Sequence, residues 1–289
     1  MKTFLLVLVT IVWGSTFFII KDTVATVNEH LIVFVRCFQA FIAMFLFQLF
    51  KNGKQLFNKK ALLYGFIIGI LLAITYTSQT IGLKYTSTGH SAFITSSAVI
   101  IVPFILFLFF KDKLLKIDIF AVTIVFAGLF LLTYDFETSM NVGDIITILT
   151  AASYGFHVVL AGRYVKKTDA VTIVTYQFLG ASIVSLLAFF LTNNEAVNIS
   201  IKAWSSLIYL GIIGTLFCYF VMVWIQKYVS SLKVAIIFSL EPVFAALFGY
   251  FIIHETLNPK ELIGAALILS GVVVHSVLKT KQLKPVNKN

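Results

Sequence analysis

Three side chains that can carry a charge lie inside long apolar stretches of this 289-residue chain: Arg36, His157 and Glu241. In a bilayer, an ionised side chain at the centre of a helix costs about 2.5–3.5 kcal/mol on insertion scales. Each of these residues is therefore expected to face a cavity or a partner. Glu241 directly precedes Pro242. It could couple protons, or it could stay protonated and donate a hydrogen bond to a carbonyl that Pro242 leaves free.

Arg36 and His157 each allow a binding role and a structural role. The guanidinium of Arg36 could bind a carboxylate or a phosphate through its fork of N–H donors. We favour a structural role, in which Arg36 extends to the outer headgroups or pairs with an acid such as Glu29. Gln39 follows on the same helical face, which indicates that this face meets protein. His157 could bind substrate, but a lone histidine in a helical bundle is more often a packing residue, and we favour that interpretation.

Aromatic residues recur at matched places in the two halves of the chain, Trp13 with Tyr154 and Tyr76 with Tyr219. Their rings could form stacking walls for a planar or cationic organic molecule. Neutral polar side chains add hydrogen-bonding capacity, and we predict no catalytic residue and no metal ligand. The predicted substrate-binding residues are Trp13, Arg36, Tyr76, Gln79, Ser97, Tyr154, His157 and Tyr219, with Glu241 as the candidate for proton coupling.

Ten apolar segments must position these side chains. The chain is 60% hydrophobic and 12% charged, with a mean hydropathy of +0.99, which excludes an ordinary soluble domain. A hydrocarbon core of about 30 Å needs about 20 helical residues, and the alternating pattern of a transmembrane barrel is absent. The fold class is therefore an all-α integral membrane protein. The predicted spans are 4–20, 31–50, 62–81, 91–110, 117–134, 145–162, 170–192, 204–225, 234–253 and 261–278.

Lysine and arginine residues are concentrated in alternate loops. With the N-terminus inside, 17 of them lie in cytoplasmic segments and four lie outside, at Lys21, Lys84, Lys202 and Lys260. This bias predicts that both termini are cytoplasmic. It also accounts for the net charge of +10, so no nucleic-acid partner is indicated. The abundance of Ile, Phe, Lys and Asn favours an AT-rich bacterial genome, and we expect a multi-pass protein of the bacterial inner (plasma) membrane.

Two distant segments carry the same pattern, one at residues 84–94 and the other at residues 227–237. Each lies between two apolar segments and leads into the fourth span of a five-span half. An odd number of spans per half inverts the second half relative to the first. Inverted repeats around a central cavity are typical of secondary transporters, whose substrate site lies near the bilayer midplane. The predicted division is a first repeat at 1–137, a second at 138–278 and a disordered cytoplasmic tail at 279–289.

The prolines of the two fourth-position helices are not matched. Pro242 aligns with Val99, whereas Pro103 lies one turn later. A proline frees the carbonyl four residues back and kinks the helix. We therefore expect the two helices to break at different depths, at Pro103 and at Pro242, and to give an asymmetric cavity.

Several motifs together resemble the EamA family of the drug/metabolite transporter (DMT) superfamily. They are Trp13-Gly14-Ser15-Thr16, the Ser-Ala-Phe-Ile-Thr at 91–95, the Leu-Glu-Pro-Val-Phe-Ala-Ala-Leu at 240–247 and Glu255-Thr256-Leu257. The resemblance covers residues 4–278. It implies two five-helix EamA repeats and a central cavity lined by spans 1, 3, 4, 6, 8 and 9. Where the family often has a glutamate after the fourth span this chain has Asp112, which puts a specific role for that residue in doubt.

Enzyme chemistry has little support in the sequence. It has no phosphate-binding Gly-rich loop with Lys-Ser/Thr and no His-Glu-x-x-His, so we expect neither an enzyme nor a cofactor. We expect a secondary active exporter of a small organic metabolite (an amino acid, a nucleotide-like compound or a drug) that works by alternating access with possible proton coupling. An uptake or exchange carrier and a non-transporting scaffold subunit are the alternatives. The expected partners are the substrate and the lipid bilayer, with the chain a monomer or a weak homodimer.

Overall fold

The computed structural model describes residues 1–52, 56, 58–133, 140–192, 199–253 and 257–282. Within these ranges, ten helical spans are long and apolar enough to cross a membrane, and no β-strand occurs. Seven spans are single helices: α1 (Lys2–Val24), α2 (Glu29–Asn52), α3 (Lys59–Tyr85), α6 (Lys116–Thr133), α7 (Val142–Tyr164), α8 (Ala170–Thr192) and α13 (Pro259–Gln282). The other three are divided: α4 (Thr88–Ser96) with α5 (Ala98–Phe110), α9 (Ile201–Ile208) with η2 (Tyr209–Phe217) and α10 (Cys218–Gln226), and α11 (Ser231–Phe238) with α12 (Glu241–Phe248) and η3 (Gly249–Ile253).

The predicted spans coincide with these helices, so the all-helical membrane fold is confirmed. The segment predicted as 170–192, for example, is α8 (Ala170–Thr192). At the C-terminal end, α13 continues past residue 278 to Gln282. The tail was therefore predicted to start too early, and its remaining residues, 283–289, lie outside the described ranges.

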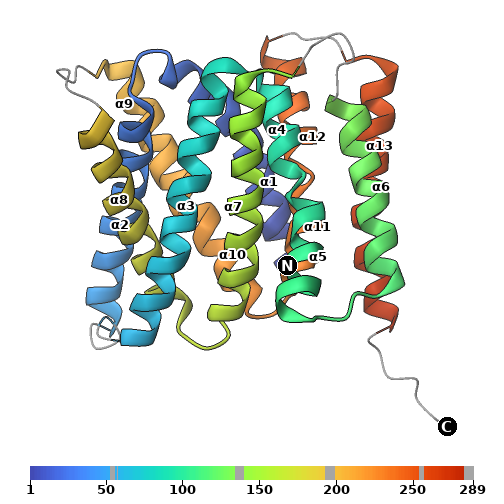
Figure 1. The fold of residues 1–289 in the computed structure, drawn as a ribbon, viewed down its shortest axis with the longest axis horizontal. Helices are drawn as coiled ribbons and strands as arrows, with labels where there is room; N and C mark the ends of the chain where they lie inside the picture. The colour runs from blue at the N-terminus through green and yellow to red at the C-terminus, as the bar shows by residue number, and fades with distance from the viewer. Residues whose placement is uncertain (53–55, 57, 134–139, 193–198, 254–256, 283–289) are drawn as a thin grey trace.

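The two matched segments lie at opposite ends of the bundle (Figure 1), one between α3 and α4 and the other between α10 and α11. Both begin a helix in the same way. Ser87 Oγ accepts a hydrogen bond from the backbone N–H of His90 at 3.1 Å, and Ser230 Oγ accepts one from Lys233 at 3.2 Å. Such serine caps satisfy an N–H group that the first turn of a helix leaves unpaired. The shared caps and opposite ends are the geometry expected of an inverted repeat.

Matched helices of the two halves pack against each other. α2 lies beside α8 at one edge of the bundle and α6 lies beside α13 at the other (Figure 1). Between them, α4 contacts α12 and α5 contacts α11, as expected for two copies related by an axis in the membrane plane. Small residues permit the close approach: a Cβ on Gly69 of α3 would lie 2.5 Å from the carbonyl oxygen of Gln177 in α8.

The two fourth-position helices break at matched places, so the prediction of different depths is wrong. The first break separates Ser96 from Ala98, and the second separates Phe238 from Glu241. Ala98 and Glu241 are related by the same offset as residues 84 and 227. A serine at each break donates its hydroxyl to the carbonyl three residues back at 2.6 Å. Such a bond competes with helical hydrogen bonding at both interruptions. At the second one, Pro242 also has no N–H to donate to the carbonyl of Phe238, where α11 ends.

The prolines take different places relative to these breaks. α5 continues as a helix through Pro103, so the predicted break at that residue is also wrong. Pro242 lies in the first turn of α12, directly after the break, so the break predicted at that residue is found there.

Candidate functional site

A small closed cavity lies between the two repeats. Its volume is about 20 Å³, enough for roughly one water molecule and too small for a metabolite. Every lining side chain is buried. The spans that line it are those implied by the resemblance, with α2 in addition. The lining residues are Trp13 and Thr16 of α1, Arg36 of α2, Thr75, Tyr76 and Gln79 of α3, Thr95 of α4, Tyr154 of α7, Tyr219 of α10 and Glu241 of α12.

Arg36 is held inside the protein, with only 1% of its surface exposed. Its Nε donates to Thr215 Oγ1 at 2.8 Å, and its guanidinium carbon lies 3.7 Å from the centre of the Tyr76 ring. Its Nη1 has no hydrogen-bond partner. The predictions that Arg36 extends to the headgroups or pairs with Glu29 are both wrong, because α2 turns this side chain toward α3 and η2, and Glu29 pairs with Lys84 instead.

The hydrogen-bond partner of Arg36, Thr215, lies in the π-helical segment η2, which also contacts two of the aromatic residues. In η2 the hydroxyl of Thr215 donates to the carbonyl of Leu210, five residues back, at 2.7 Å. The carbonyl of Gly214 accepts hydrogen bonds from Trp13 Nε1 at 2.8 Å and from the Tyr76 hydroxyl at 3.5 Å. Such segments are rare and are frequent at functional sites. Sequence reasoning missed Gly214 and Thr215; the available signal was two glycines and a threonine inside an apolar run.

The four predicted aromatic residues do meet at this cavity. The Trp13 ring lies 5.1 Å from the Tyr219 ring and 6.0 Å from the Tyr154 ring, and Tyr76 meets Tyr219 edge to face at 5.6 Å. The Tyr154 hydroxyl is buried without a hydrogen-bond partner. Aromatic faces attract cations, most strongly where water is excluded.

Glu241 is the first residue of α12 and only 6% exposed. Among the described residues its carboxylate has no hydrogen-bond or ion-pair partner, so the bond to a freed carbonyl that the sequence allowed is not formed. Glu241 and Tyr154 also line a second small cavity between the two broken helices. Arg36 and Glu241 therefore face one cavity from different repeats without an ion pair between them.

The other predicted residues take three different positions. Gln79 lines the cavity and donates to Thr95 Oγ1 at 3.3 Å. His157 does not line it; it packs behind Tyr219 with ring centres 5.2 Å apart, and its Nε2 forms a hydrogen bond with Gln177 Oε1 at 3.0 Å. Ser97 lies at the break before α5 with its hydroxyl bonded to the backbone.

Polar contacts link the repeats at both ends of the bundle. At the end where α3 leads into α4, the Thr86 hydroxyl donates to the carboxylate of Asp144. At the other end, Arg163 donates to both carboxylate oxygens of Asp112 at 2.8 and 2.7 Å. Asp112, whose role the resemblance left in doubt, thus joins the loop after α5 to α7. With both ends linked, the central cavity is closed.

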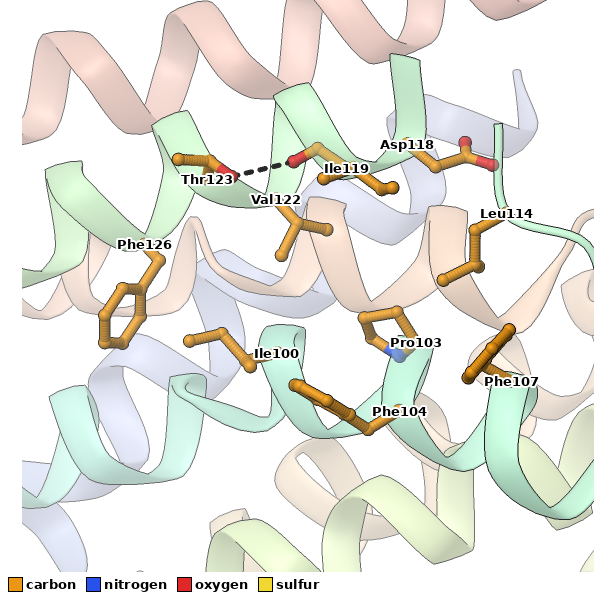
Figure 2. Close-up of a pocket in the computed structure, with 10 residues that line it drawn as sticks. All are labelled: Ile100, Pro103, Phe104, Phe107, Leu114, Asp118, Ile119, Val122, Thr123 and Phe126. Carbon is orange, nitrogen blue, oxygen red and sulfur yellow. Dashed lines mark hydrogen bonds between the residues drawn. The ribbon is translucent and has the colours of Figure 1, made fainter. Parts of the chain in front are cut away.

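A larger cavity of about 370 Å³ lies between α5 and α6 (Figure 2). Pro103, Phe104 and Phe107 of α5 face Val122 and Phe126 of α6 across it. Phe104 and Phe107 are more than half exposed, so the cavity opens outward from the bundle.

The one acid of this outer cavity is already bound, since the carboxylate of Asp118 accepts hydrogen bonds from the backbone N–H of Leu115 at 3.1 Å and from His275 Nε2 at 2.9 Å. The outer cavity therefore suits hydrocarbon. A further cavity of about 280 Å³ lies at the end of the bundle, beside Asp112, Arg163 and Lys166. No cluster of three potential metal ligands occurs in the part of the chain that the structure describes.

Comparison with known proteins gives a consistent result. Residues 1–134 and 141–277 match the EamA-like transporter family. A protein of Archaeoglobus fulgidus described as an uncharacterized transporter is 32% identical over 94% of this chain and 84% of its own length. The uncharacterized inner membrane transporter YedA of Escherichia coli is 24% identical over 91% of this chain and 87% of its own length. A solved crystal structure, 16% identical, has the same fold with a TM-score of 0.78 over 98% of both chains.

Proposed function

The chain belongs to the EamA-like transporter family, and we propose that it is a secondary active exporter that moves a small organic metabolite by alternating access, driven by the proton gradient. One observation carries this proposal. Two side chains that can carry opposite charges, Arg36 and Glu241, line a closed cavity between inverted repeats without pairing with each other. Buried charges of this kind mark substrate and ion pathways in membrane proteins.

Alternating access needs the cavity to open at one end at a time. The contacts that link the repeats are suited to this, because Thr86–Asp144 and Arg163–Asp112 lie at opposite ends of the bundle. Breaking one while keeping the other would let water and substrate reach the cavity from one side only. The helix breaks before Ala98 and Glu241 are the points about which the outer halves of those helices would turn.

Glu241 is the proposed proton site. It is the one acid that lines the central cavity, and within the described residues no cation neutralises it. A carboxylate in that position is costly while the cavity is closed and dry, so closing favours proton uptake or a bound positive group. Opening to water on either side would allow the proton to leave.

Membrane and orientation are part of the proposal. The charge bias of the loops supports cytoplasmic termini, and the likeness to YedA, an inner membrane transporter by name, supports the inner membrane of a bacterium.

Ser87→Cys and Ser230→Cys should react with impermeant thiol reagents from opposite sides, the first from outside and the second from the cytoplasm. Cys37 and Cys218 are both buried and should stay unlabelled. Labelling of both introduced cysteines from one side would contradict this topology.

Transport itself can be tested with purified protein in proteoliposomes. A pH gradient should drive saturable accumulation of at least one compound from a labelled panel of amino acids, nucleosides and cationic drugs, and Glu241→Gln should remove the dependence on the gradient. Glu261→Gln, at the start of α13 and outside the cavity, is the matched control. Pure exchange without a gradient effect would favour an exchange carrier, and the absence of any saturable flux would favour a scaffold subunit.

A further inference from the structure

We propose that the cavity beside Arg163 binds a phosphate group, at the end of the bundle where the proposed topology has the cytoplasm. This cavity of about 280 Å³ is separate from the central one and lies where α5, α7 and α11 meet. Its volume is close to the lower end of ligand pockets in proteins, about 300 Å³. A site of this kind would bind its ligand whether or not the protein transports a substrate.

The charged residues that line this cavity are mostly cations. They are Arg163, Lys166 and Lys167, against the single carboxylate of Asp112. Lys166 and Lys167 are exposed and form no ion pair within the described part of the chain. Because Asp112 is already bound to Arg163, the two lysines leave a positive charge for an anion from outside the chain to neutralise.

Arg163 does not use all of its donors on Asp112. Both hydrogen bonds to the carboxylate come from Nη2, at 2.8 and 2.7 Å, and Nε is buried without a hydrogen-bond partner. The guanidinium carbon lies 3.8 Å from the centre of the Phe110 ring. The side chains of Arg163 and Asp112 are 34% and 44% exposed, so an incoming anion can reach the pair. A phosphate group can therefore compete with Asp112 for the fork of Arg163.

The start of α11 adds backbone donors. Ser230 and Ser231 line the cavity, and the Ser230 hydroxyl accepts a hydrogen bond from the N–H of Lys233. The first N–H groups of a helix have no acceptor within it, and the helix dipole is positive at this end. Such N–H groups favour phosphate, so the helix start and the cations act on the same ligand.

The opposite end of the bundle has the same backbone without the cations. The helix cap there, Ser87, matches Ser230. The positions that match the three cations hold other residues, namely Asp22, Ala25 and Thr26. The cationic cavity is therefore not a by-product of the duplication, and it belongs to one end of the bundle only.

Two sources can supply phosphate here, the headgroup of an anionic lipid and free phosphate in the cytoplasm. The cavity lies where the apolar α5 passes into Lys111-Asp112-Lys113, at the end of a span, and Leu106 gives it an apolar wall. Basic pockets between membrane helices on the cytoplasmic side bind lipid headgroups. The apolar wall suits the part of a lipid next to its phosphate, so a lipid is the expected source.

Binding can be measured with the full-length protein in detergent. Dioleoylphosphatidylglycerol should raise the unfolding temperature in a saturable manner, because a ligand of the folded state stabilises it by mass action. Dioleoylphosphatidylcholine, whose phosphate is neutralised by choline, should have a much weaker effect. Inorganic phosphate, titrated at constant ionic strength, is the second arm. A saturable effect of the anionic lipid identifies the headgroup as the source, and one of inorganic phosphate alone identifies free phosphate.

Charge-changing variants should move the affinity in opposite directions. Lys166→Gln/Lys167→Gln should weaken binding about 10- to 30-fold, since each cation near the headgroups contributes roughly a factor of five. Asp112→Asn frees Arg163 and removes the one acid, so it should tighten binding about 5-fold. A misfolded variant would not bind more tightly.

The matched control is Lys59→Gln/Lys60→Gln, which removes the same charge at the start of α3, at the same end of the bundle (Figure 1). Equal loss of binding in this control would overturn the proposal, because the net charge of the surface and not the cavity would then attract phosphate. Weaker binding by Asp112→Asn, or no saturable effect of either probe, would overturn it as well. None of these results touches the proposed transport function, whose cavity is elsewhere.

Discussion

The two interrupted spans, α4–α5 and α11–α12, share one backbone and differ in their chemistry. Each begins with a serine cap, and each breaks beside a serine that bonds back to its own helix. At the first residue after the break, however, the first span has Ala98 and the second has Glu241. The duplicated backbone places this residue at the same point in both repeats, but only in the second repeat is it an acid.

The second spans of the repeats show the reverse asymmetry. Asn28 caps α2, and Asp169, its counterpart in the second repeat, caps α8. The same alignment matches Arg36 with Gln177. Arg36 enters the central cavity, whereas Gln177 stays behind it and bonds to His157. Each repeat thus contributes one charge and a neutral residue at the position that matches the other's charge, which gives the cavity two differently charged sides.

Moving the carboxylate to the matched position would test this asymmetry most strongly. Ala98 lines the second small cavity but not the central one, so in Glu241→Ala/Ala98→Glu the acid should not face Arg36. We expect gradient-driven flux in proteoliposomes to fall about 100-fold in Glu241→Ala and to stay low in the double variant. Recovery of flux in the double variant would show that the side of the cavity that carries the acid does not matter.

The contact between α3 and α8 should differ sharply from the start of α4 in its tolerance of a methyl group. A Cβ on Gly69 would lie 2.5 Å from a backbone oxygen, whereas one on Gly89 meets no atom closer than 4.0 Å. Gly69→Ala should lower the free energy of unfolding by about 3 kcal/mol, and Gly89→Ala should be neutral or slightly stabilising. Thermal unfolding in detergent measures both, and equal effects would contradict the close packing.

Two matched acids at the start of the fifth spans should also behave differently. Asp118 of α6 is buried and binds His275, whereas its counterpart in α13, Glu261, is partly exposed and caps its own helix. Asp118→Ala removes the acceptor of a buried hydrogen bond and should cost about 2 kcal/mol. Glu261→Ala should cost less than about 1 kcal/mol. If the two variants unfold at the same temperature, the α6–α13 pairing does not depend on Asp118.

The third spans differ in helix type, and a conservative pair of variants probes that difference. α3 is a continuous α-helix, whereas its counterpart contains η2, where Thr215 binds both Arg36 and the Leu210 carbonyl. Thr215→Val keeps the shape and removes the acceptor of Arg36, so it should destabilise the protein by about 1 kcal/mol. Thr215→Ser keeps the hydroxyl and should be close to wild type in the same thermal assay. Equal loss in both would mean that the methyl group, not the hydroxyl, matters.

Much of the fold could be predicted because it depends on local or repeated signals. Apolar runs indicated the ten spans, and the Ser87 and Ser230 segments indicated the inverted repeat. The aromatic part of the site was also predictable, since Trp13, Tyr76, Tyr154 and Tyr219 lie at matched places in the two halves. The choice of transported molecule, the direction and the coupling ion stay predictions.

The unpredicted part depends on contacts between distant segments. Arg36 meets Thr215 of the second repeat, which lies in the π-helical segment η2. Hydropathy could not tell Ser97 from Thr95, because the direction of each side chain on the helix decides which hydroxyl reaches the cavity. The break of the first of these spans was misplaced because proline is a strong sequence signal, whereas α5 continues through Pro103 and the interruption lies beside Ser97.

The position of Trp13 gives the protein its own optical probe. Its indole touches Tyr154, Tyr219 and the Gly214 carbonyl, all from the second repeat, and it is 5% exposed. Trp204 and Trp224 are the other two tryptophans, both away from the cavity. After their replacement by phenylalanine, the remaining fluorescence would move to longer wavelength whenever water enters between the repeats, so each turnover would be visible without an attached dye.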